Sequence, residues 1–136
     1  MYLIEKNNVM KLAEELAKSY DLYGPVIDKE TKQVFFNKVE NASEISLTAE
    51  IPALPPKTVV FPQIERITQY KYDKVGKKAE IAMTYDDRSK AIFGIRPCDL
   101  TGIIVLDRFF LGQEFVDDVY KEHRKRMFIV SNTCVV

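Results

Sequence analysis

The chain contains few of the residues that build metal centres or disulfide frameworks. Among its 136 residues there are two cysteines and one histidine. Zinc and iron–sulfur sites usually take four ligands, so this sequence cannot fill such a site alone, and two cysteines are too few for a disulfide scaffold. The chain also lacks an excess of charge, because 20 basic residues balance 20 acidic ones. This balance gives no bulk electrostatic reason to expect binding to nucleic acid or to a membrane surface.

Long apolar runs are missing as well. No apolar run approaches the roughly 20 residues that a membrane-spanning helix needs. The opening residues, MYLIEK, lack the basic-then-apolar order of a secretory signal peptide. We therefore predict a cytoplasmic protein that does not insert into a membrane. The length and the 46% hydrophobic content predict one core and a single domain over residues 1–136.

The first half of the chain predicts one helix and several short strands. Apolar residues between positions 9 and 20 recur at the spacing of one buried helix face, and Asn8 can cap that helix. Residues 26–27 and 34–36 flank a polar turn and predict a β-hairpin. The segment around residues 45–47 alternates apolar and polar side chains, which is typical of another half-buried strand.

The middle of the chain is marked by four prolines between Pro52 and Pro62. Proline forbids a helix interior and disfavours a central strand, so we predict an extended segment that lies across a surface or against a partner. A short helix is predicted over residues 64–70. A charged turn follows, and then an alternating strand over residues 79–83.

The second half alternates strands and helices. An apolar run over residues 91–95 predicts a buried strand, a helix is expected from Leu100 to Leu111 with Gly112 ending it, and Glu114 begins a second helix. The run over residues 127–130 predicts a further strand, which makes a right-handed parallel crossover. The predicted fold class is therefore α/β (α+β mixed). We expect a mixed β-sheet with packed helices, in which an N-terminal helix and hairpin precede a C-terminal βαβ-like unit.

The two cysteines follow two of these predicted strands. Cys98 lies in the turn after residues 91–95, and Cys134 follows the strand over residues 127–130. Ligands of open α/β sheets bind at the carboxyl ends of strands, and a helix N-terminus favours a thiolate, a cluster sulfide or a phosphate. These positions predict a shared site. The alternative is that both cysteines are small buried residues, because free cysteine behaves as a compact hydrophobe.

Two charged residues flank Cys98. Arg96 could lower the pKa of the thiol, contact an anionic group such as a flavin phosphate, or form a surface ion pair. Asp99 is a good N-cap for the following helix. His123 shares a helix face with apolar residues, so a core histidine is favoured over a ligand. No Ser/His/Asp grouping, Gly-rich phosphate loop or paired-carboxylate pattern in the sequence predicts catalysis.

Several segments together form a family pattern. They are VFPQIE at residues 60–65, FGIRPCD at residues 93–99, and the C-terminal run with Cys134, and LYGPV at residues 22–26 also fits. Through these segments the chain resembles the N-terminal domain of a family of iron–sulfur electron-transfer subunits. That family comprises the β subunit of sulfhydrogenase and the related iron–sulfur subunit of anaerobic sulfite reductase. The resemblance covers nearly the whole chain, and FGIRPCD is its most specific part.

This resemblance implies an electron-transfer domain of an anaerobic, cytoplasmic, multi-subunit oxidoreductase, with other redox subunits as partners and no catalytic residues of its own. Members of the family continue with further cysteines and a two-cluster ferredoxin module, so we expect the polypeptide to continue past Val136. Cys98 and Cys134 would be two thiolate ligands of a [4Fe–4S] cluster whose other ligands lie outside this chain. Arg96 and Asp99 would line the same cofactor site.

On its own, the chain would hold an incomplete cluster or none. Two other interpretations stay open. The first is a subunit-interaction domain whose cysteines are structural and which carries no cofactor. The second is a flavin- or nucleotide-binding domain at the turn of residues 96–99, and a flavin could equally belong to a partner subunit.

Overall fold

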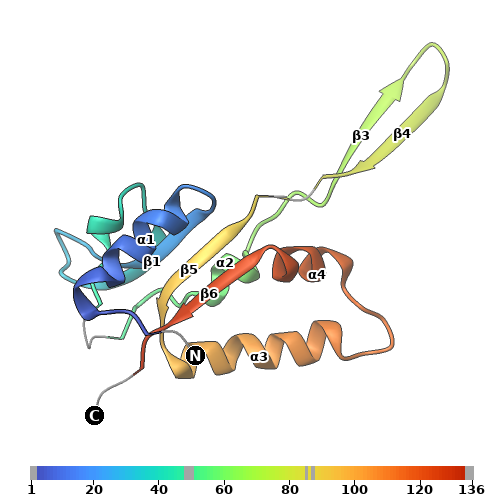
Figure 1. Ribbon diagram of the computed structural model, residues 1–136. Coiled ribbons are helices and arrows are strands. Elements are labelled where there is room, and N and C mark those ends of the chain that lie inside the picture. The colour runs from blue at the N-terminus through green and yellow to red at the C-terminus, as the bar shows by residue number, and fades with distance from the viewer. Residues whose placement is uncertain (1–2, 48–50, 85, 87, 134–136) are drawn as a thin grey trace.

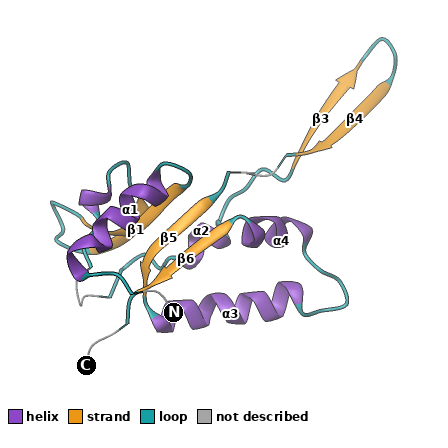
Figure 2. Ribbon diagram, viewed as in Figure 1, coloured by secondary structure: helices purple, strands orange, loops and turns teal. Residues whose placement is uncertain are grey.

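The computed structural model describes residues 3–47, 51–84, 86 and 88–133. Its main sheet has four strands in the order β2-β1-β5-β6, which are Asp21–Ile27 (β1), Val34–Lys38 (β2), Lys90–Ile95 (β5) and Met127–Ser131 (β6) (Figure 2). β1 and β2 are antiparallel, whereas β5 is parallel to both β1 and β6. The α/β class with a mixed sheet, an N-terminal hairpin and a parallel strand–helix–strand unit is thus confirmed.

Helices pack on both faces of this sheet (Figure 1). α1 (Val9–Ala17) covers one face, and its core cluster consists of Ala13, Leu16, Leu22, Val39, Ala42, Ile45, Ala91 and Phe93. The helices α2 (Lys57–Val60), α3 (Pro97–Leu111) and α4 (Asp118–Lys125) belong to the other face. The cluster on that side consists of Phe36, Val59, Val60, Ile92, Ile95, Ile103 and Tyr120. Within the described ranges, no helix combines the length and apolar character needed to cross a membrane.

β5 changes register just before it ends. Phe93 pairs with Val130 and Ile95 pairs with Ser131, so the ladder skips Gly94. Gly94 has a φ of +80°, a backbone conformation that residues with a side chain rarely adopt. This bulge places Ile95 in the core beside α3, whereas Phe93 points to the core beside α1. It therefore sets the direction in which the chain leaves the sheet and enters α3.

A second sheet projects from the body and consists of two antiparallel strands, β3 (Thr68–Asp73) and β4 (Lys78–Met83) (Figure 1). We call residues 68–83 the hairpin arm. Every residue of both strands is exposed. The predicted strand over residues 79–83 is confirmed, but the predicted helix over residues 64–70 is wrong. The stretch from Thr68 is strand because threonine and tyrosine favour strands and because it pairs with β4.

The proline-rich segment contains a one-turn helix, α2, which its prolines were expected to exclude. Pro56 stands at the start of this helix, where no amide proton is needed, and the next proline comes only after the helix has ended. Val59 and Val60 are buried. The segment therefore places two of its apolar side chains in the core of its own domain, whereas Leu54 and Phe61 are 36% and 48% exposed.

Two further boundaries differ from the prediction. Residues 42–44 form a 3₁₀ turn closed by a capping box between Asn41 and Glu44, and Ile45 then enters the core, so the strand predicted around residues 45–47 is wrong. α4 begins at Asp118 rather than at Glu114. The reason is that the Asp117 carboxylate accepts a hydrogen bond from the Tyr120 amide at 2.8 Å and caps the helix there.

A hydrogen-bond network ties α3 to α4. The Asp107 carboxylate accepts bonds from the Tyr120 hydroxyl at 2.7 Å and from the Arg124 guanidinium at 2.7 and 2.9 Å. Partial burial raises the pKa of Asp107, but the hydrogen bonds from Arg124 and Tyr120 outweigh burial and hold that pKa below its ordinary value. The folded state therefore favours the carboxylate, which stabilises the protein above about pH 4.

We expect Asp107→Asn to lower the free energy of unfolding at pH 7 by about 1–3 kcal/mol, because Arg124 loses a two-pronged charged partner. The difference from the natural protein should shrink as the pH falls below about 4, where the natural carboxyl group is protonated as well. Urea unfolding followed by circular dichroism at pH 7 and at pH 3 measures both effects. The control is Glu15→Gln, which removes an exposed pair with Lys18 and should change stability little. Equal losses from the two variants at pH 7 would contradict the role of Asp107.

Candidate functional site

The parallel strands of the main sheet end at one side, which we call the carboxyl edge. There Ile95 of β5 pairs with Ser131 of β6. The Ile95 carbonyl oxygen accepts hydrogen bonds from the Asn132 amide at 2.7 Å and from the Ser131 hydroxyl at 3.1 Å. Cys98 follows Ile95, and Cys134 follows Ser131, at the same spacing. The strands that lead to the two cysteines are therefore neighbours. Cys134 itself lies outside the described residues, so the meeting of the two sulfur atoms stays a prediction.

Cys98 lies in the first turn of α3 and its side chain is exposed. The helix begins at Pro97, earlier than the predicted Leu100, because proline suits the first helical position. The first backbone bond of the helix runs from the Leu100 amide to the Arg96 carbonyl at 2.9 Å. The amides of Cys98 and Asp99 therefore point out of the end of the helix, where the helix dipole favours negative charge.

The predicted capping role of Asp99 is wrong. Arg96 occupies the N-cap position with an extended backbone, and Asp99 lies inside the first turn. Partial burial raises the pKa of Asp99, and the nearby charges of Arg96 and Lys57 act in the opposite direction. Two cations and one carboxylate thus surround the turn that carries Cys98. Lys57 was not predicted from the sequence, because only the packing of α2 near α3 brings it here.

The outer face of α3 is apolar and exposed. Ile103 is its one fully buried residue, whereas Ile104, Val105 and Phe109 are 42%, 57% and 63% exposed. Thr101 and Arg108 are exposed beside them, and the three apolar side chains have no cover among the described residues. Cys98, Gly102, Val105 and Phe109 follow one another at helical spacing and share a face.

Gly102 lies on this shared face, one turn after Cys98. A Cβ atom added there would meet nothing within 4 Å. Nothing in the described part of the chain therefore requires glycine at this position, although glycine weakens a helix interior by about 1 kcal/mol relative to alanine. Because Gly102 has no side chain, another molecule can approach the helix backbone closely beside Cys98.

The donor set at the carboxyl edge fits a single ligand of a cluster. Cys98 supplies one accessible sulfur atom at a helix end that favours anions. No group of three or more histidine, cysteine, aspartate or glutamate side chains able to hold a metal ion occurs among the described residues. A complete four-ligand site would therefore need Cys134 and donors from elsewhere.

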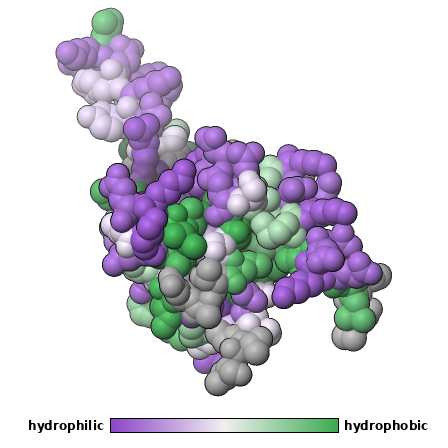
Figure 3. Space-filling model, turned by 90° about the vertical axis from the view of Figure 1, so that its left-hand side faces the viewer, coloured by the Kyte–Doolittle hydropathy of each residue, from purple (hydrophilic) through white to green (hydrophobic). Residues whose placement is uncertain are grey.

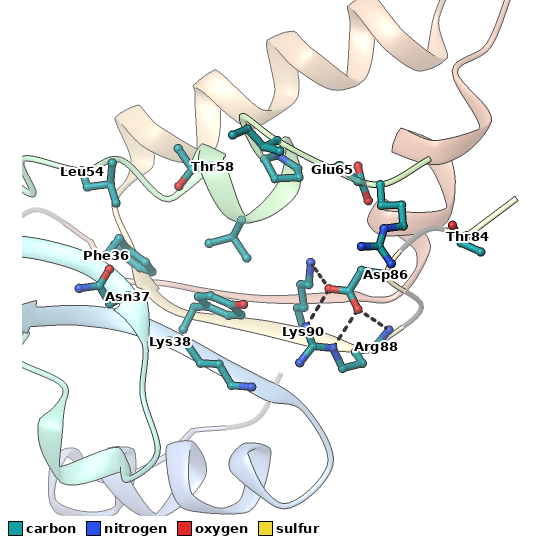
Figure 4. Close-up of a pocket in the computed structure, with 15 residues that line it drawn as sticks. Phe36, Asn37, Lys38, Leu54, Thr58, Glu65, Thr84, Asp86, Arg88 and Lys90 are labelled. Carbon is teal, nitrogen blue, oxygen red and sulfur yellow. Dashed lines mark hydrogen bonds and ion pairs between the residues drawn. The ribbon is translucent and has the colours of Figure 1, made fainter. Parts of the chain in front are cut away.

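A pocket of about 730 Å³ is lined by residues of the β1–β2 hairpin, of α2 and of the amino end of β5 (Figure 4). Asp86 pairs there with Arg88 at 2.9 Å and with Lys90 at 3.1 Å. Hydrogen bonding to Arg88 is the main reason that the pKa of Asp86 lies far below its ordinary value. Asp21, close by, pairs with Arg88 and Lys38. Asp86 and Asp21 each pair with two of the basic side chains, so we interpret these ion pairs as a structural network that holds the base of the hairpin arm.

His123 belongs to the core, as the sequence predicted. It is buried, its Nδ1 atom lies 3.3 Å from the Val60 carbonyl oxygen, and its Nε2 atom lies 2.9 Å from Glu65 Oε1. The basic residues that follow it are held in ion pairs at the end of α4, where Arg124 contacts Asp107 and Lys125 contacts Glu122. No observation on this histidine points to a metal.

Comparison with known proteins gives one informative similarity. The chain is 32% identical over 114 residues to a protein named sulfhydrogenase 2 subunit beta from Pyrococcus furiosus. The match covers 84% of this chain but 31% of that relative, so the chain spans about a third of the relative's length. No protein-family model matches the chain. No solved structure matches it either.

Two glycine substitutions test whether Gly102 serves something outside the chain. Gly102→Ala should raise the free energy of unfolding by up to about 1 kcal/mol, because alanine favours the helix and the space is open. Gly94→Ala is the control and should destabilise the protein, because its positive φ and the close Leu47 side chain disfavour a Cβ atom. Thermal and urea unfolding measure both. A loss of stability in Gly102→Ala would show that this glycine is needed by the fold itself.

Proposed function

We propose that this chain is the leading domain of an iron–sulfur subunit that transfers electrons within an anaerobic, cytoplasmic oxidoreductase of the sulfhydrogenase or sulfite reductase type. The similarity to sulfhydrogenase 2 subunit beta supports a redox subunit of a hydrogenase-type complex. The observation that carries the proposal is the pairing of Ile95 with Ser131, because Cys98 and Cys134 each follow one of these two residues by three positions in the sequence. Other subunits of the complex are the proposed partners.

In this proposal, Cys98 and Cys134 are two thiolate ligands of a [4Fe–4S] cluster, and the other ligands come from further along the natural polypeptide. A bound cluster of this kind supplies one-electron transfer. The residues of this chain hold and tune it. The N-terminus of α3 and the charges of Arg96 and Lys57 stabilise the negative charge of thiolates and sulfides. Asp99 lies in the same turn and limits how much positive charge the site carries.

The outer face of α3 completes the proposed site. An electron carrier must come close to its donor and acceptor, and the face that includes Cys98 and Gly102 offers an apolar surface with no side chain at its centre. A partner subunit that packs there would cover the apolar residues and bring its own redox group near Cys98. A flavin at residues 96–99 is not part of the proposal. Pro97 removes one amide from this turn, and the turn has no glycine, so it lacks the row of amides that phosphate sites use.

A second candidate function is a subunit-interaction domain without a cofactor. The observation in its favour is the exposed apolar face of α3, because interaction surfaces are often large and apolar. The two functions differ in whether Cys98 is needed for iron binding.

We expect Cys98→Ala, made in the natural full-length protein and purified without oxygen, to lose about one to four iron atoms per chain, because the iron that Cys98 would hold loses its thiolate and the cluster is then degraded or lost. Iron and sulfide analysis and electron paramagnetic resonance measure the loss. The control is Thr101→Ala, which changes the same turn by removing a bond to the Pro97 carbonyl at 2.8 Å and should keep the iron. An unchanged iron content in Cys98→Ala would leave the interaction domain as the better interpretation.

A further inference from the structure

The hairpin arm has one apolar face and one charged face. Its register sets Tyr70 opposite Ile81 and Lys71 opposite Glu80. Successive side chains of a strand point to opposite faces, so the two faces can be assigned from the register. The apolar face consists of Thr68, Tyr70, Tyr72, Ala79, Ile81 and Met83. The charged face consists of Gln69, Lys71, Asp73, Lys78, Glu80 and Ala82.

The apolar face has no cover within the described part of the chain. Tyr70 and Ile81 are 74% and 75% exposed, and Tyr72 and Met83 are more than half exposed. Figure 3 shows that the arm stands clear of the body. An isolated two-stranded hairpin is at best marginally stable in water, and this one packs on no helix or third strand. The arm therefore carries an apolar surface that the described part of the chain leaves unburied.

The arm is also positively charged. Between residues 68 and 83 there are four lysines and two acidic residues. Lys74 and Lys77 lie in the turn at the tip, on either side of Val75, which is 95% exposed. The acidic residues of the charged face are each opposite a lysine, since Lys71 faces Glu80 and Asp73 faces Lys78. The excess charge is therefore at the tip.

We propose that the hairpin arm docks into an apolar groove, rimmed by acidic side chains, on a different protein chain. The groove would cover the face of Tyr70 and Ile81, and its acidic rim would lie against the lysines of the tip. This interface does not depend on the proposed cluster. It assigns a binding surface to the part of the chain that contributes nothing to either core.

A second copy of this chain fits the arm less well. Two arms stacked face to face with their tips together would bring two clusters of lysines together, which costs free energy, and arms stacked in opposite directions would keep the two clusters apart. The footprint of one face is only about 20 Å by 10 Å, estimated from strands of this length. A stable interface needs roughly 800 Å² from each partner, so two flat arms bury too little. A groove that encloses the face and both free edges of the hairpin buries more.

Site-specific crosslinking tests the orientation of the arm. Benzoylphenylalanine is placed at position 70 on the apolar face, or at position 71 on the charged face, of the natural full-length protein in its source cells. We expect position 70 to crosslink to one other polypeptide, at a peptide with apolar and acidic residues, at least about tenfold more than position 71 does. A crosslink to a second copy, to lipid or to nucleic acid, equal yields from both positions, or no crosslink at all would overturn the proposal.

The affinity for the purified crosslinked polypeptide gives a second measurement. Tyr70→Thr with Ile81→Thr removes an opposed apolar pair but keeps residues that favour strands, and Kd should rise at least about tenfold. The matched control, Lys71→Thr with Glu80→Thr, changes the neighbouring opposed pair and should leave Kd within about threefold. Lys74→Glu with Lys77→Glu should weaken binding and reverse its dependence on salt, because added salt would then screen a repulsion between like charges. Equal Kd values for the two opposed-pair variants, or binding that does not respond to salt in the natural protein, would refute the docking mode.

Iron analysis of the same variants separates this proposal from the proposed function. The arm variants should keep the iron content of the natural full-length protein, whereas Cys98→Ala should keep the affinity for the partner. A loss of iron in Tyr70→Thr/Ile81→Thr would show that the arm acts on the fold, and would overturn its assignment as an independent docking surface.

Discussion

The structure depends on the burial of β5 on both of its faces. All six residues of this strand are buried, and its neighbours on both edges run parallel to it. Phe93 contributes to the core beside α1, and Ile92 to the core beside α3, so one strand holds the two cores together. Lys90 begins the strand with its charge neutralised by Asp86. Because β5 cannot move without opening both cores, the residues that follow it are placed by the most constrained element of the fold.

How well the sequence predicted each element depends on how much that element buries. α1, the β1–β2 hairpin, β5 and β6 were predicted correctly, because the hydrophobic pattern that identifies them is also the cause of their folding. The stretch from Thr68 was wrongly predicted as a helix. Its side chains are all exposed, so its hydrophobic pattern does not indicate a buried face of either a helix or a strand. The conformation of this stretch is fixed by its pairing with β4, which the hydrophobic pattern of the stretch alone does not reveal. α2 was missed because prolines flank that helix without entering it.

The candidate site was partly predictable for a related reason. Cys98, Arg96 and Asp99 could be placed at the end of a strand, because the apolar run before them is unambiguous. The capping role of Asp99 was wrong because the helix starts at Pro97, three residues before the predicted Leu100, which periodicity alone does not reveal. Lys57 could not be predicted at all, since its position depends on the packing of α2 near α3. Gly102 carried a usable signal, a glycine inside an apolar helix, whose significance appears only when the open space beside it is known.

The strand that organises the cores also separates the two proposed surfaces. The hairpin arm joins the amino end of β5, whereas Cys98 emerges from its carboxyl end (Figure 1). Electron transfer requires that little protein lies between redox groups, whereas strong docking requires that much surface is buried. One surface that served both purposes could not combine a short separation of the redox groups with a large buried area. With the arm bound in a groove of one partner, the affinity of the complex would come from contacts far from the cluster. At the carboxyl edge and the outer face of α3, few side chains would then separate the cluster from a redox partner that approaches at Gly102. The contact with that redox partner could be brief, because the arm would hold the complex together.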